Sequence, residues 1–132
     1  MVITVIGVVP PCPRCKHIYD LAAEAAEELG VQVDMKKLAY DADESLQYGK
    51  VGTAHHIAEW ADMEMDWSKI REVLSEEWTQ ALDDCLMPCT RKAKEKGWLM
   101  TPVLIIDDEV AFSGYVPKKE EIKSALKKAL EA

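Results

Sequence analysis

The chain has 132 residues, a net charge of −8 and 48% hydrophobic residues, values typical of one globular domain with a core of its own. This composition argues against disorder, and the acidic balance argues against nucleic-acid binding, which needs a basic surface. Residues 1–9 are too short to span a bilayer and lack the basic start of a secretory signal. We therefore expect a cytoplasmic protein without a membrane partner, in which four cysteines indicate redox or metal chemistry.

The acidic charge is concentrated in the middle of the chain. Twelve acidic and three basic residues lie in 41–84, so this region carries −9 and the remainder of the chain +1. The four tryptophans lie in or just after the same region, and we expect Trp60, Trp67 and Trp78 to pack its helices onto the core. The acidic surface is either simply solvated or selects a basic partner.

The first 35 residues predict a βαβ unit. Residues 2–6 are almost continuously apolar and β-branched, as expected for a strand covered on both faces. A helical stripe follows from Lys16 and ends at Gly30. Apolar residues alternate over 31–35 and predict a second strand, parallel to the first.

The middle of the chain predicts helices. A short helix over 43–48 precedes a second helical pattern that starts at Thr53. Asp66 is a suitable N-cap for a long helix running to Cys85. Pro88 should break that helix, and a further short one would end at Gly97.

The end of the chain predicts two antiparallel strands, over 103–106 and 110–112, joined by a tight turn. A last helix opens at Pro117 and exposes its lysines. Its inward residues would be Ile122, Ala125, Leu126, Ala129 and Leu130.

The segment Cys12-Pro13-Arg14-Cys15 carries the chemistry. It joins a strand to a helix, and a helix N-terminus favours a thiolate through its unpaired N–H groups and its dipole. We interpret Cys12 and Cys15 as a dithiol/disulfide pair, in which Cys12 attacks and Cys15 resolves the mixed disulfide. Arg14 and Lys16 add positive charge that should help to keep Cys12 ionised. A structural or metal-binding pair is the alternative.

The order of elements and this motif resemble the thioredoxin fold, closest to the small glutaredoxin-like thioredoxins. The match covers 1–35 and 100–130, including Thr101-Pro102. The resemblance implies a four-stranded mixed sheet flanked by helices, with β-α-β followed by β-β-α. It also implies a cis peptide before Pro102, facing the active cysteines. Substrate polypeptide would bind along the groove formed by Pro13, Arg14, Thr101 and Pro102.

The chain departs from this family in its middle. We predict one domain, with its core in 1–40 and 98–132, and an acidic all-helical insertion at about 41–97 that includes the family's short middle helix. Pro11 replaces the tryptophan that precedes the first cysteine in many thioredoxins. The first strand carries no acid, so no general base is assigned for the second thiol.

Cys85 and Cys89 form a candidate second redox pair. If Pro88 bends the chain, Cys89 lies in the first turn of a helix near basic residues, which favours a thiolate. Cys85 would lie on an apolar stripe, where buried cysteine is common. The two sulfurs are therefore either inert core thiols or a relay that exchanges a disulfide with the first pair.

The four thiols suggest metal binding as an alternative, but no finger-like spacing separates the two pairs, and no metal site is assigned. His55 and His56 are adjacent and point about 100° apart on a helix, which suits a surface better than one ion. His17 either tunes Cys12 or lies on the surface.

We therefore expect a thiol–disulfide oxidoreductase that needs no organic cofactor. Its partners would be disulfide-containing protein clients and a reductase or partner dithiol; the oligomeric state is not predicted. The alternative is a non-catalytic metal-binding or redox-sensing module on a thioredoxin scaffold.

Overall fold

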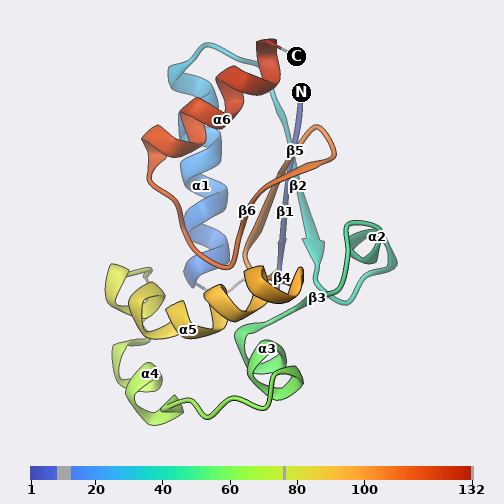
Figure 1. Ribbon diagram of the computed structural model, residues 1–132. Helices are drawn as coiled ribbons and strands as arrows, with labels where there is room; N and C mark the ends of the chain where they lie inside the picture. Colours follow the sequence, from blue (N-terminus) through green and yellow to red (C-terminus); the bar gives the residue numbers. More distant parts are fainter. Residues whose placement is uncertain (9–12, 76, 132) are drawn as a thin grey trace.

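The computed structural model of the chain describes residues 1–8, 13–75 and 77–131 (Figure 1). Four strands form a mixed sheet in the order β2-β1-β5-β6. The bounds are β1 (Val2–Gly7), β2 (Asp34–Ala39), β5 (Val103–Ile106) and β6 (Glu109–Ser113). The fold is thioredoxin-like, with the predicted β-α-β and β-β-α halves side by side in one sheet.

The β1–β2 pair is parallel, as the βαβ pattern predicts, with Val2 opposite Asp34. Strand β2 starts later than the alternating pattern suggests, because the residue after Gly30 still belongs to the end of the first helix. Gly30 has a φ of 69°, and the N–H of Val31 bonds to the carbonyl of Ala26 at 3.0 Å. This Schellman closure uses Val31 to satisfy the helix end.

Two helices, α1 (Pro13–Glu28) and α6 (Lys119–Glu131), lie side by side against the sheet (Figure 1). Ile18 and Ile122 are fully buried in the core that they share with β1 and β5. Helix α6 begins two residues after the predicted start. Leu130 is 53% exposed, so its predicted inward orientation is wrong, because it lies in the last turn, where the helix passes the end of the core.

The middle of the chain is helical except for one short strand. Its elements are α2 (Asp43–Leu46), β3 (Val51–Gly52), α3 (Ala54–Trp60), α4 (Trp67–Val73) and α5 (Gln80–Lys96), followed by β4 (Leu99–Met100). Strands β3 and β4 form a parallel pair of two residues each, which the sequence does not predict. Helices α3, α4 and α5 lie at the end of the molecule away from the two termini (Figure 1).

The predicted long helix from Asp66 to Cys85 is wrong. Asp66 does cap a helix, since its carboxylate accepts from the N–H of Lys69, but that helix ends at Val73. Two contacts favour the break before α5. The Ser75 hydroxyl donates to the Glu77 carbonyl, a local bond that competes with the helix, and the Trp78 ring stacks on His17 with centroids 4.6 Å apart.

The predicted break at Pro88 is also wrong, because α5 continues through it to Lys96. The ring of Pro88 is exposed, while side chains on the opposite face are buried in a core shared with α3. Burial of that face holds the helix together although Pro88 offers no N–H to the carbonyl of Asp84. Gly97 ends α5 in the left-handed conformation, as predicted.

Trp78 packs the middle region onto the core of the sheet as expected, whereas the other tryptophans pack in a separate cluster. Trp60, Trp67 and Trp98 pack against the core formed by α3 and α5, and Trp78 packs against the core of α1 and the sheet. Among the residues that the structure describes, none of the helices is long and apolar enough to cross a membrane.

We predict that Glu28 makes the stability of the fold depend on pH in the acid range. Hydrogen bonds from Lys119 and then Lys123 lower the pKa of Glu28 from 4.5 to about 2. Because the folded pKa is the lower one, this contribution is present above pH 4.5 and is lost as the pH falls toward 2.

Urea unfolding as a function of pH tests this. Glu28→Gln should flatten the acid loss of stability, whereas Glu27→Gln, a change at the exposed neighbouring position, should leave it as in the wild type. Identical pH profiles for wild type and Glu28→Gln would contradict the prediction.

Replacing Pro88 by alanine should stabilise the protein. Alanine restores a donor for the Asp84 carbonyl and removes the ring, so the free energy of unfolding should rise by about 1–3 kcal/mol. Urea unfolding followed by circular dichroism measures the change. Arg91→Ala, on the exposed face of α5, is the matched control and should stay within about 0.5 kcal/mol of wild type.

Candidate redox site

The predicted redox motif lies where β1 ends and α1 begins. Cys12 lies outside the described residues, and the described part of the motif begins at Pro13. Cys15 is in the first turn of α1 and is 4% exposed. Gly7, the last residue of β1, faces it: a Cβ atom there would lie 2.6 Å from Cys15 Sγ. The absence of a side chain at Gly7 therefore lets the second cysteine pack against the strand.

An apolar hollow of about 130 Å³ borders Cys15 on the side of β1 and β2. Val5, Tyr19 and Leu38 supply apolar surface, and the ammonium of Lys37 lies 4.5 Å from the centroid of the Tyr19 ring. The second cysteine is thus surrounded mainly by apolar groups, with one cation at the edge of the hollow.

Arg14, which we expected to help ionise Cys12 and to line the substrate groove, points into the protein. It is 5% exposed, and its Nε donates to Asp83 Oδ1 at 2.7 Å. Its Nη1 donates to the carbonyl of Thr101 at 3.2 Å, and its Nη2 donates to the carbonyl of Gly114. One side chain inside the CxxC motif therefore binds α5, the Thr101-Pro102 loop and the segment after β6.

Asp83 is the other half of this buried ion pair. It is 1% exposed and lies on α5, 69 residues from Arg14. Its second oxygen, Oδ2, accepts from the N–H of Val116 at 2.7 Å. Both carboxylate oxygens thus have partners, which a buried charge requires.

The peptide bond between Thr101 and Pro102 is cis, and both residues are buried. The Thr101 N–H donates to the carbonyl of Gly52 at 3.0 Å, and its carbonyl accepts from Arg14. The structure therefore brings the loop to the first turn of α1, with the main chain of Thr101 bonded inside the protein. Of the four positions expected to contact substrate, only Pro13 is partly exposed.

Cys85 and Cys89 lie on one continuous helix, α5, so the predicted position of Cys89 in a helix first turn is wrong. Cys89 is fully buried, and this burial raises the pKa of its thiol, against a smaller lowering effect of Arg14. Cys85, expected to be the more buried, is partly exposed. Residues four apart on a helix have Cβ atoms about 5–6 Å apart, whereas a disulfide needs about 3.5–4.5 Å. A local bond between these two sulfurs would therefore distort α5.

The histidines take structural positions. His56 is partly buried and completes a capping box with Thr53, whose N–H donates to His56 Nδ1 at 3.1 Å. His55 is exposed and stacks on Trp67, with centroids 4.0 Å apart. Within the described parts of the chain, no three side chains of histidine, cysteine, aspartate or glutamate are grouped so that they could hold a metal ion.

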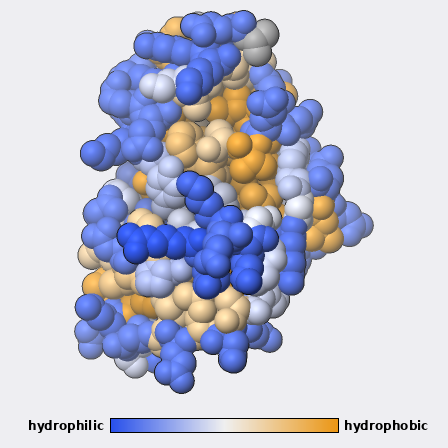
Figure 2. Space-filling view, in the orientation of Figure 1, coloured by the Kyte–Doolittle hydropathy of each residue, from blue (hydrophilic) through white to orange (hydrophobic). Residues whose placement is uncertain are grey.

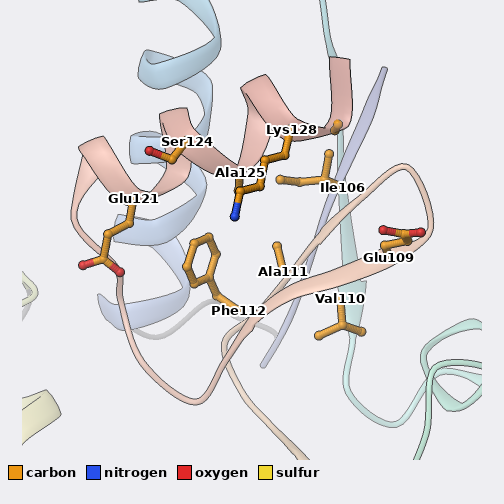
Figure 3. A pocket seen from close by; sticks show the side chains of 10 residues that line it. Ile106, Glu109, Val110, Ala111, Phe112, Glu121, Ser124, Ala125 and Lys128 are labelled. Atoms are coloured by element: carbon orange, nitrogen blue, oxygen red, sulfur yellow. The ribbon is translucent and has the colours of Figure 1, made fainter. Parts of the chain in front are cut away.

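A hollow of about 560 Å³ lies elsewhere, between the β5–β6 hairpin and α6 (Figure 3). Phe112 and Lys128 line it from the two sides, and its lining contains no cysteine. Figure 2 shows apolar surface over this hairpin, where Val110 is 40% exposed. The hollow is therefore separate from the redox motif.

Sequence reasoning missed two residues of this site, Gly7 and Asp83. A glycine that ends a strand just before a CxxC motif is a signal for close approach, and it could have been used for Gly7. For Asp83 the only hint is that a basic residue inside CxxC needs an acidic partner if it is buried. Nothing in the sequence distinguishes Asp83 from the other acids nearby.

Comparisons with known proteins agree with the fold. A family model described as "Thioredoxin domain" matches residues 89–127, from the middle of α5 to α6. The chain is also similar to a thioredoxin from Methanocaldococcus jannaschii, at 26% identity over 120 residues, which cover 91% of this chain and 81% of that protein. No solved structure is a significant match.

The sheet order and the flanking helices define a thioredoxin-like fold. Both matches agree with this fold, and the chain is similar to proteins of the thioredoxin family. The same findings support a role of the thiol-oxidoreductase type. The matched family segment does not include Cys12 or Cys15.

We predict that Cys85 and Cys89 differ strongly in reactivity. In the folded, reduced protein, iodoacetamide should modify Cys85 at least roughly tenfold faster than Cys89, because Cys89 is buried and the pKa of its thiol is raised. Peptide mass spectrometry over time gives both rates. In denaturant the two rates should become similar, and similar rates in the folded protein would contradict the structure.

Proposed function

We propose that this protein is a protein disulfide oxidoreductase that uses Cys12 and Cys15 as its dithiol/disulfide couple. The observation that carries the proposal is the first turn of α1, in which Cys15 packs against Gly7 and Arg14 bonds to Thr101 in the loop before Pro102. Free N–H groups and the helix dipole at this turn favour a thiolate. Sulfur atoms carry the electrons, so the proposed chemistry needs no organic cofactor.

The proposed reaction proceeds by two thiolate exchanges. The Cys12 thiolate attacks one sulfur of a client disulfide, which forms a mixed disulfide and releases the other client sulfur as a thiolate. The Cys15 thiolate then attacks Cys12 Sγ and releases the second client thiolate. The client disulfide gains two electrons, and Cys12 and Cys15 become a disulfide. A reductase or a partner dithiol in the cytoplasm then reduces this bond by the same exchange.

Client binding is proposed on the side of Pro13. Thr101 and Pro102 are buried, and Arg14 is engaged by three internal acceptors, so we assign these residues to holding the loop against α1. Pro13 is partly exposed and borders a hollow of about 210 Å³ that Lys16, His17 and Trp78 also line. A client segment next to its disulfide would lie in this hollow.

The buried position of Cys89 gives the relay no support. A relay needs Cys85 and Cys89 to form a disulfide with each other, and although Cys85 is partly exposed, Cys89 is fully buried on the continuous helix α5. The proposed function therefore uses the first pair alone.

Replacing Cys12 should abolish the activity. Cys12→Ser is expected to lower the rate of insulin reduction with dithiothreitol at least roughly a hundredfold, because the attacking thiolate is removed. Cys15→Ser should retain attack but not resolution, so a client should remain bound to Cys12 through a mixed disulfide that dithiothreitol releases.

Cys85→Ser and Cys89→Ser are the matched controls, and they should keep the wild-type rate. Loss of activity in either variant would support the relay hypothesis. Peptide mapping of partly oxidised protein would then show a disulfide between the two cysteine pairs. Purification with one equivalent of a bound metal ion, together with no turnover by the wild type, would overturn the oxidoreductase proposal in favour of a metal-binding module.

A further inference from the structure

The Arg14–Asp83 pair joins the redox motif to a helix from the middle of the chain. Both side chains are buried, at 5% and 1% exposure, and the Nε–Oδ1 distance is 2.7 Å. Neighbouring groups complete the hydrogen bonding: the carbonyls of Thr101 and Gly114 on the arginine, and the N–H of Val116 on the aspartate. Each nitrogen of the guanidinium and each oxygen of the carboxylate therefore has a hydrogen-bond partner, and the pair is buried, in contrast to the exposed ion pairs on the helices.

The charge of Arg14 acts on a nearby thiol from this position. A guanidinium remains protonated in proteins, and a buried charge is screened much less than an exposed one. The Arg14 charge lowers the pKa of the Cys89 thiol, against the larger opposite effect of burial. Arg14 is also the residue before Cys15 and the second after Cys12. Asp83 offsets this charge. Removing Asp83 should therefore change the stability of a thiolate at the motif.

We propose that Asp83 is a positioning residue that holds Arg14 and offsets its charge, and that this sets the reduction potential of the Cys12–Cys15 couple. The inference rests on the proposed function, because it concerns the same couple. It gives α5 a part in the chemistry, since the residue that adjusts the couple comes from this helix and not from the motif.

The direction of the effect follows from the two redox states. The reduced couple contains a thiolate, whereas the disulfide is uncharged. An unbalanced Arg14 cation would stabilise the thiolate and therefore the reduced state, which raises the reduction potential. An unbalanced Asp83 carboxylate would act in the opposite direction. The intact pair keeps the potential between these two limits.

A double-mutant cycle tests the proposal. The couple is equilibrated with reduced and oxidised dithiothreitol at pH 7, and its dithiol fraction is measured by alkylation and mass spectrometry. Asp83→Asn should shift the equilibrium toward the dithiol by roughly tenfold, or about 30 mV. Arg14→Gln should shift it the other way. The double variant should lie close to wild type, because neither charge remains.

Asp84→Asn is the matched control, since Asp84 is the next residue on α5 but is exposed and bonded only to the Gln80 amide among the contacts described. It should not move the equilibrium. Absorbance titration of the Cys12 thiolate supplies a second readout, with a lower pKa in Asp83→Asn and a higher pKa in Arg14→Gln.

If the two single variants shift the dithiol fraction in opposite directions, the role of the pair is electrostatic. Loss of packing would give no reason for the two shifts to be opposite. If one single variant does not fold, the other still tests the direction of the shift in the dithiol–disulfide equilibrium. Shifts in the same direction, or no shift, would overturn this inference while the couple itself remains. A wild-type protein that forms no reversible Cys12–Cys15 disulfide would overturn the proposed function instead.

Discussion

Burying the Arg14 guanidinium at the first turn of α1 is the physical constraint on which the rest of this site depends. Removing a charge from water costs several kcal/mol unless partners replace the water. Here the partners are one carboxylate from α5 and two main-chain carbonyls, from Thr101 and Gly114. Because segments far apart in the sequence converge on Arg14, the middle of the chain contributes a residue, Asp83, to the candidate redox site.

Much of the fold could be predicted, because its signals are local. The apolar strand before the motif, the stripe of α1, its end at Gly30 and the hairpin after Pro102 follow from side-chain period and turn chemistry. The errors lie where a tertiary contact decides. Burial of one face of α5 keeps that helix intact through Pro88, and stacking of Trp78 on His17 accompanies a break in an otherwise helical pattern. The β3–β4 strands are two residues each, too short to show an alternating pattern in the sequence.

The site was predictable only as far as its motif. A CxxC pair at a helix start and a Thr-Pro step can be read from the sequence, and the structure brings the described residues of both together through Arg14. The role of Arg14 could not be read in this way. The sequence predicted a positive charge acting on Cys12, but not that Arg14 is buried against Asp83, 69 residues away, and no periodicity links such a pair. Long-range charge pairing of this kind depends on the assembled fold.

The main chain of Thr101 also bears on how a client would be recognised. A client strand that paired beside Pro102 would have to displace the Gly52 carbonyl from the Thr101 N–H, a bond of 3.0 Å. Exchanging one such hydrogen bond for another yields little net free energy. Affinity would then have to come from side-chain contacts outside this loop, and the partly exposed Pro13 and the hollow bordered by Trp78 lie beside the motif. Both Gly52 and Trp78 belong to the middle of the chain, so on the proposed function this region would contribute to client selection.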